Sequence, residues 1–255
     1  MTADTYTYVY GVQRKGEPLP PELVGVEDAC AVETIAGFRL QAITSQVPSR
    51  SFTAESLSLL LEDPAWLAPR VRAHEALIES CMAASSSLVP FRFCTIFEDR
   101  ERARRELDDR ESYFLWLLEK LDGMEEWEIR AYVDLDTLVH TAALSSPEAP
   151  EKRGSAGFAY MARKQLERTL AKEAENLAYR RIHEIQDVLS MLSRDQKELA
   201  AKDLDQEPWL REVRLIPRTN VPRFLERLDH FQDHLEPQGF DIRVTGPWPA
   251  YHFVE

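Results

Sequence analysis

The stretch WLREVRLIPRTNVPRFLERLDHFQDHLEPQGFDIRVTGPWP, residues 209–249, determines the fold that we expect for the second half of this chain. Its first part, residues 209–218, is rich in apolar side chains and predicts a strand. Residues 219–239 then predict a helix, with Thr219 or Asn220 near its N-terminal cap. Residues 240–249 predict a further strand, so the stretch is a strand, a helix and a strand.

Earlier segments extend this pattern. Residues 126–144, EWEIRAYVDLDTLVHTAAL, alternate apolar side chains and begin a second sheet, and residues 145–157 are crowded with Pro, Ser, Gly and charges and predict a loop. A long helical pattern over residues 160–192 carries an apolar stripe that suits either the core, which we expect, or a seam against another helix. Short connections and right-handed crossovers would place the strands in one sheet with helices on one face, an α+β sandwich of ferredoxin-like type.

The first half of the chain predicts a small sheet with helices. Residues 6–12, YTYVYGV, are aromatic and β-branched and predict a first strand. Residues 30–35 and 38–47 predict two more strands, joined by a hairpin turn at Gly37. Residues 87–97, SLVPFRFCTIF, alternate again and predict another strand, whose proline places it at a sheet edge or at a strand start.

Helical patterns lie between and after these strands. Thr53 is placed to cap a short helix, and Asp63 before a proline is placed to cap an amphipathic helix over residues 64–84. Residues 98–123 have an acidic start, a charged face and a terminal glycine, which predict one helix. Acidic residues interleave the arginines of this helix, so we expect an ion-paired, solvated face instead of a phosphate-binding patch; the arginines are Arg100, Arg102, Arg104 and Arg105.

These patterns divide the chain into two domains. We expect an N-terminal α+β domain over residues 1–97, a connecting helix over residues 98–125, and a C-terminal ferredoxin-like domain with a long helix and a tail over residues 126–255. The repeated switch from strand period to helical period on either side of the connecting helix motivates this division.

Composition and charge exclude several classes of protein. The chain has 31 basic and 44 acidic residues, and its formal charge of −13 opposes binding to nucleic acid and to anionic lipid. It has no apolar run near the roughly 20 residues that cross a bilayer, and its start lacks the features of a signal peptide. Cys30, Cys81 and Cys94 form neither a disulfide framework nor a CxxC pair, so we expect small buried residues. We expect a cytoplasmic protein that binds neither nucleic acid nor a membrane.

A helical pair of histidines is the best local candidate for a metal site. His230 and His234 lie one turn apart, which is the spacing that can chelate zinc or nickel. A third ligand would have to come from Glu226 or Asp233, which are ordinary helix-surface carboxylates. We therefore expect no metal at this pair.

A second candidate for chemistry is His74, which could act as a general base beside Glu75. Adjacent helix residues point to different faces, so we expect instead a structural, hydrogen-bonded His74 at a domain seam. The sequence also lacks GxSxG, Walker, GxGxxG and HExxH motifs. We expect no catalytic residues, no cofactor and no enzyme activity.

The chain ends with VTGPWPAYHFVE, residues 244–255, where the aromatic side chains are Trp248, Tyr251 and Phe253. Terminal residues stay ordered only when something holds them, and three aromatic rings carry a large apolar area for burial. Pro247 and Pro249 fix the backbone and prevent the segment from extending the last strand as a central member of a sheet. We expect a structural tail held mainly by the chain's own domains, with a partner-binding motif as the alternative.

Several short stretches, in this order along the chain, resemble the gas vesicle protein GvpL/GvpF family. They are YVYGV (8–12), AHEALIES (73–80), LVPFRFCTIF (88–97), EWEIRAYVD (126–134), GFAYMARKQLE (157–167) and GPWPAYHF (246–253). Each stretch is weak alone, but together they span nearly the whole chain, and the GPWPAYHF ending is the most specific. One departure is Cys94, because the family often has glycine after RF, so a tight backbone contact there is expected to differ.

The resemblance implies a cytoplasmic accessory or minor structural protein of gas vesicle assembly. Such a protein would bind the small hydrophobic shell subunit and other gas vesicle accessory proteins and would support vesicle nucleation or growth. The resemblance implies two α+β domains with a ferredoxin-like C-terminal part, and it brings no catalytic residues. The alternative is a small-molecule or metal-dependent enzyme on a ferredoxin-like scaffold, which a convergent, accessible cluster around His74 or the His230–His234 pair would favour.

Overall fold

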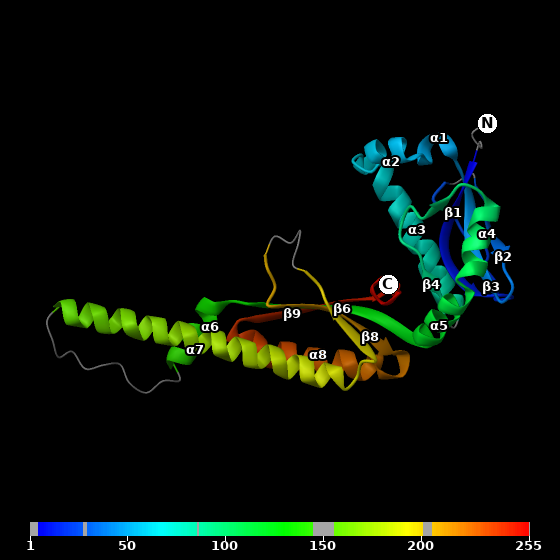
Figure 1. Ribbon diagram of the computed structural model, residues 1–255. Helices are drawn as coiled ribbons and strands as arrows, with labels where there is room; N and C mark the ends of the chain where they lie inside the picture. The colour runs from blue at the N-terminus through cyan, green and yellow to red at the C-terminus, as the bar shows by residue number, and fades with distance from the viewer. Residues whose placement is uncertain (1–4, 28–29, 86, 145–155, 201–205, 255) are drawn as a thin grey trace. The chain divides into compact units, whose positions relative to one another are not determined.

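The chain forms two separate antiparallel sheets (Figure 1). The computed structural model describes all residues except 1–4, 28–29, 86, 145–155, 201–205 and 255. Contacts group the chain into a first unit, residues 1–125 with 247–255, and a second unit, residues 126–246. Of the loop expected over residues 145–157, residues 145–155 are not among the described residues.

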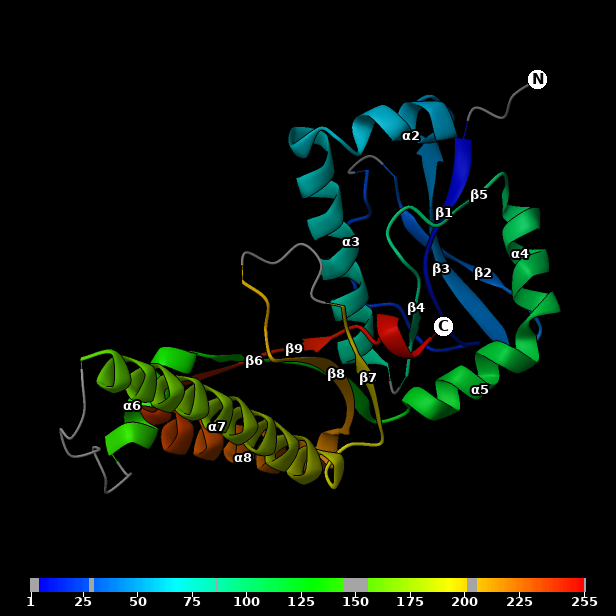
Figure 2. The same cartoon turned by 60° about the vertical axis from the view of Figure 1, so that its left-hand side comes forward.

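The elements of the first unit are β1 (Thr5–Arg14), β2 (Val32–Ala36), β3 (Leu40–Pro48), α1 (Ser49–Phe52), α2 (Ala54–Leu60), α3 (Pro64–Ala84), β4 (Val89–Pro90), β5 (Ile96–Phe97), α4 (Arg100–Asp109) and α5 (Glu111–Leu121). The strand order is β2–β3–β1–β4, and β5 also pairs with β1. Strand β1 is therefore central, and Figure 2 shows α3 on one side of this sheet and α4 and α5 on the other.

Strand β1 is buried on both of its faces. Tyr8 and Tyr10 belong to the apolar cluster that α3 completes, whereas Val9 lies against α4 and α5 on the opposite face. The register with β3 shifts between Val9 and Gly11, which marks a β-bulge. Because the bulge adds one residue, Val12 lies on the same face as Val9 despite the three-residue spacing. One strand thus supplies the core on both sides of the sheet.

Two helix starts in the first unit lie where the sequence placed them. The Thr53 side chain accepts a hydrogen bond from the Ser56 backbone N–H at the start of α2. The Asp63 carboxylate accepts one from the Ala65 backbone N–H at the start of α3, where Pro64 is the first helical residue. Both caps satisfy backbone donors that no helical carbonyl can reach.

The connecting helix expected over residues 98–123 is instead two helices, α4 and α5, that meet at Arg110. Arg110 has φ −107° and ψ 17°, which breaks the helical path. Its guanidinium lies over the rings of Tyr113 and Phe114, with Cζ 4.8 and 5.0 Å from the ring centroids. Both helices pack against the first sheet, so this segment is part of the first unit and not a bridge.

The expected ion-paired face of α4 is found for two of its four arginines. Arg100 pairs with Glu33 on β2, and Arg104 pairs with Asp108 one turn later on the same helix, at 3.6 Å. These pairs are solvent-exposed and contribute little to stability.

The elements of the second unit are β6 (Met124–Val133), α6 (Leu135–Leu144), α7 (Ala156–Ser190), β7 (Asp195–Glu198), β8 (Leu210–Pro217), α8 (Val221–Leu235) and β9 (Phe240–Trp248). The strand order is β7–β8–β6–β9. Helices α7 and α8 lie side by side along this sheet in both views (Figures 1 and 2). Strand β9 is an edge strand, which is where a segment that ends in a Pro-Trp-Pro sequence can lie.

Among the side chains of helix α7 that the structure describes, those that join the core lie in its C-terminal half. There the buried residues recur at three- and four-residue steps and face the sheet; they are Ala174, Ala178, Ile182, Ile185 and Leu189. This confirms a core stripe on the helix, although Leu177 and Val188 are only partly buried. The described side chains from Tyr160 to Glu173 are exposed except for Leu170, which is half-buried.

The sequence missed two elements of the second unit. Residues 135–144, expected to continue strand-forming sequence, form α6, because the Asp134 carboxylate accepts hydrogen bonds from the backbone N–H groups of Asp136 and Thr137. Strand β7, with the sequence DQKE, has no apolar alternation and is a strand because it pairs antiparallel with β8. None of the described helices combines the length and apolar character that a membrane crossing requires.

The strand expected over residues 87–97 is two short strands, β4 and β5, separated by a turn in which the Thr95 N–H donates to the Arg92 carbonyl. Cys94 has φ +64° in this turn, a left-handed conformation that glycine adopts without cost. Its N–H donates to the Tyr8 hydroxyl at 2.8 Å, which holds the turn against β1. The conformation explains why a glycine suits this position.

We expect Cys94→Gly to be more stable than Cys94→Ala by about 1 kcal/mol, because alanine keeps the left-handed strain and glycine removes it. The two variants remove the same thiol, so their difference isolates the backbone. Urea unfolding of both proteins measures it. An alanine variant as stable as the glycine variant would show that the turn is not strained.

Candidate functional site

His74 on α3 is fully buried in the first unit, and both of its ring nitrogens have partners. Nε2 lies 3.1 Å from the Phe91 carbonyl oxygen, and Nδ1 lies 3.0 Å from the Tyr8 hydroxyl. A carbonyl can only accept, so Nε2 carries the proton and Nδ1 accepts from Tyr8. Burial lowers the pKa of the His74 imidazole to about 4, although the hydrogen bond to Phe91 acts in the opposite direction.

His74 is therefore hydrogen bonded, as expected, but it lies inside the first unit and not at a domain seam. Its neighbour Glu75 turns away and accepts from the Tyr251 hydroxyl at 3.1 and 3.2 Å. The two side chains form no acid–base pair, and neither nitrogen of His74 is available to a substrate.

The three cysteines are free, and burial raises the pKa of each thiol, to about 11 for Cys81 and Cys94. Thiols with these values stay protonated at neutral pH and are poor nucleophiles. Cys81 is fully buried, whereas Cys30 and Cys94 are half-buried. The expectation of small, buried residues holds fully only for Cys81.

The C-terminal tail, residues 247–255, groups with the first unit, whereas the sequence pattern predicts that it belongs to a domain over residues 126–255. The reason is its packing: Phe253 is 1% exposed, the Lys120 ammonium lies 5.4 Å from its ring centroid, and the Tyr113 hydroxyl donates to the Val254 carbonyl at 3.0 Å. Tyr251 packs against the core cluster of the first unit. Trp248 differs from the expectation, because it is 41% exposed at the end of β9.

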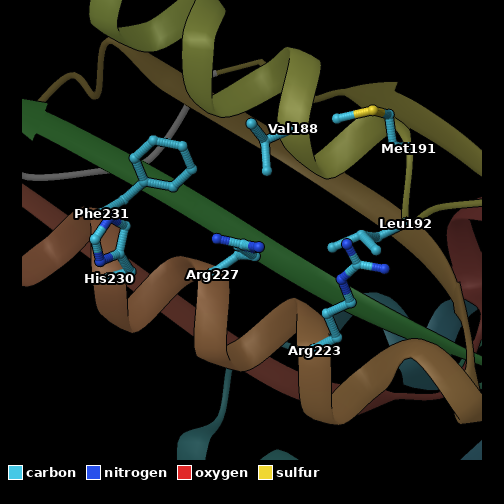
Figure 3. A pocket seen from close by; sticks show the side chains of 7 residues that line it. All are labelled: Val188, Met191, Leu192, Arg223, Arg227, His230 and Phe231. Carbon is cyan, nitrogen blue, oxygen red and sulfur yellow. The ribbon is translucent and has the colours of Figure 1, made fainter.

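The second unit has an open hollow of about 570 Å³ between α7 and α8, which we call the α7–α8 groove. Its lining residues are Val188, Met191, Leu192, Arg223, Arg227, His230 and Phe231. Figure 3 shows the arginines extending from α8 toward the end of α7, where Val188 and Met191 lie. The groove thus has an apolar side and a basic side.

His230 and His234 stack with ring centroids 6.4 Å apart and an interplanar angle of 7°. His230 belongs to the α7–α8 groove. Within the described ranges, no three His, Cys, Asp or Glu side chains are arranged to hold a metal ion. No motif marks Arg223 and Arg227 in the sequence, although their four-residue spacing and the seven residues from Arg223 to His230 place all three on one stripe of α8.

Comparison with known proteins gives a match along nearly the whole chain. The sequence model of the family described as "Gas vesicle synthesis protein GvpL/GvpF" matches residues 6–255. The chain is 29% identical to gas vesicle protein L of Streptomyces sp. (strain CB03234), with 100% of this chain and 94% of that protein covered. It is 26% identical to gas vesicle protein F of the same strain, with 98% and 99% covered.

Two crystal structures have a similar fold. The gas vesicle protein GvpF from Anabaena sp. PCC7120 superposes with a TM-score of 0.67 at 19% identity, covering 98% of this chain and 96% of that one. GvpF from Microcystis aeruginosa gives a TM-score of 0.66 at 19% identity, covering 98% and 99%. The fold similarity extends through both units.

We expect acid to destabilise the protein through His74. The folded-state pKa of about 4 lies below the ordinary 6.5, so between these values the unfolded chain binds the proton that the folded protein excludes. This contribution is complete above pH 6.5 and is lost as pH falls toward 4, by about 3 kcal/mol in all. Urea unfolding at several pH values, compared with His74→Gln, measures it. A variant with the same pH dependence as the parent protein would contradict the assignment.

We expect Phe253→Ala to destabilise the first unit by about 3 kcal/mol or more, because it removes a buried ring, and deletion of residues 247–255 to cost at least as much. Trp248→Ala is the matched control and should cost much less, since that ring is partly exposed. Thermal unfolding measures the melting temperatures of these three variants and of the parent protein. If Phe253→Ala has the same melting temperature as the parent protein, the tail does not stabilise the first unit.

Proposed function

Because the chain belongs to the GvpL/GvpF family of gas vesicle synthesis proteins, we propose that it supports gas vesicle assembly by binding the small hydrophobic shell subunit. The family match over residues 6–255 is the observation that carries this proposal. Relatives named gas vesicle protein L and gas vesicle protein F align over nearly their full lengths, so both units take part in the similarity. Other gas vesicle accessory proteins are further partners in this proposal.

The shell subunit poses the physical problem that such a protein would solve, which is aggregation before assembly. A subunit that builds a wall with a gas-facing apolar surface must be kept from aggregating before it is incorporated. A partner with apolar surface for the client and high net charge elsewhere would keep the pair in solution. This chain has a charge of −13 and an apolar-sided groove between α7 and α8.

Two domains, the second of ferredoxin-like type, form the structural part of the proposal. The second unit runs β6, α6 and α7, β7, β8, α8, β9, which is a split β–α–β arrangement repeated once. Its strand order, β7–β8–β6–β9, places the first and third strands in the centre, which supports the ferredoxin-like assignment. The grouping of contacts into two units supports two domains.

The enzyme alternative receives no support from the candidate residues. It requires a convergent, accessible cluster at His74 or at the His230–His234 pair. His74 is fully buried with both nitrogens bonded, and the described residues near the histidine pair supply no three-ligand set. The family is one of gas vesicle proteins and is not an enzyme family. We place the protein in the cytoplasm, associated with gas vesicles.

We expect the affinity-tagged chain to retain the shell subunit when it is purified from cells that express a complete gas vesicle gene cluster. Cells whose cluster lacks this chain should form no vesicles or few, as electron microscopy and flotation measure. A tagged protein of similar size and negative charge is the control for nonspecific capture. Normal vesicles without the chain, or retention of the shell subunit no stronger than in the control, would exclude the proposed function.

A further inference from the structure

The α7–α8 groove is a surface that the core leaves open. Leu192 at its base is 7% exposed, but Met191 beside it is 77% exposed and Val188 is half-buried. On the α8 side, Phe231 is half-buried next to the exposed His230. A hollow of about 570 Å³ with exposed apolar atoms has room for more than one side chain of a partner.

Charge on α8 is segregated into two stripes. Arg223, Arg227 and His230 follow one another at four- and three-residue steps and line the groove. The acidic residues of the same helix, Glu226, Asp229 and Asp233, form the adjacent stripe at three- and four-residue steps, and they do not line the groove. The groove is therefore locally basic in a protein whose formal charge is −13.

The two arginines also lack internal partners. Among the described residues, neither Arg223 nor Arg227 makes an ion pair or a side-chain hydrogen bond, whereas Arg211, Arg214 and Arg243 in the same unit are all paired with carboxylates. A guanidinium presents donors that match a carboxylate in two parallel bonds. Charge complementarity therefore calls for acidic groups on whatever enters the groove.

Building on the proposed function, we infer that the α7–α8 groove binds an amphipathic helix of the shell subunit, one that carries carboxylates along the border of its apolar face. An apolar side chain of that helix enters between Val188, Met191 and Phe231, and its flanking carboxylates pair with Arg223 and Arg227. A helix is the occupant that fits, because a groove between two helices accepts the ridge of a third. The arginines set the orientation of the client, and the apolar side supplies buried area.

Charge reversal of the groove tests this inference. We expect Arg223→Glu with Arg227→Glu to weaken retention of the shell subunit at least about tenfold, because two attractive pairs become repulsive. Arg223→Lys with Arg227→Lys keeps the charge and should bind within a few-fold of the parent. The matched control is Arg72→Glu with Arg105→Glu, which makes the same change in net charge at exposed arginines of the first unit. All variants should keep the parent's melting temperature, since the four arginines are exposed.

A second experiment tests whether acidic residues of the shell subunit are what binds in the groove. Single Asp→Lys and Glu→Lys substitutions are scanned through the shell subunit, and at least one is expected to restore retention by the charge-reversed variant. If the parent retains the shell subunit and the reversed variant retains it equally, the groove is not the site, although the proposed function stands. If the parent fails to retain it, the proposed function fails and the inference fails with it.

Two further outcomes would assign the groove differently and overturn the inference. A dimer of this chain that dissociates on charge reversal, measured by analytical ultracentrifugation, would make a second copy the occupant. Inorganic phosphate that displaces the shell subunit, when chloride at matched ionic strength does not, would make the groove an anion site.

Discussion

The buried guanidinium of Arg214 is the contact on which the geometry of the second unit depends. Arg214 and Glu212 are two residues apart on β8, so both side chains lie on one face of the sheet, and they pair at 2.5 Å with exposures of 0% and 1%. The guanidinium also donates to the hydroxyls of Ser190 and Ser193 and to the Gln186 carbonyl. A buried charge is tolerated only when its donors are satisfied in this way. The network fixes the end of α7 to β8, and this end places Val188 and, directly after the helix, Met191 at the groove.

The first unit has a comparable buried polar centre, but its members, His74 and Tyr8, are uncharged. His74 and Tyr8 connect α3 to β1, and the Tyr8 hydroxyl also accepts from the Cys94 turn, so one phenol holds a helix, a strand and a loop. Both centres are directional contacts inside apolar clusters, and they specify how helices sit on sheets where apolar packing alone would allow sliding. His74 and Tyr8 thus have a structural role, whereas the groove is lined by two arginines, His230 and apolar side chains.

Local patterns in the sequence predicted the local structure well. The caps at Thr53 and Asp63, the first strands and the long helix follow from spacing and cap chemistry, which act within a few residues. One missed feature depends on a distant partner, because DQKE is a strand only where β8 lies beside it. The break at Arg110 was missed although the rings under its guanidinium, those of Tyr113 and Phe114, lie within about one helical turn. The groove could not be predicted either, because the role of Arg223 and Arg227 depends on where α7 ends. For the tail, the sequence indicated that the rings would be held, but not by which unit.

The grouping of residues 247–255 with residues 1–125 has a consequence for synthesis on the ribosome. The first unit is discontinuous in sequence, and its segment 247–255 is made after the second unit. Translation at roughly 5–20 residues per second places the whole of the second unit between the two parts of the first. The second unit can fold as it emerges, whereas the first must wait, with the site for Phe253 unfilled, until residues 247–255 have emerged. A chain that terminates before Phe253 would therefore keep an open apolar site that quality-control proteases and chaperones recognise.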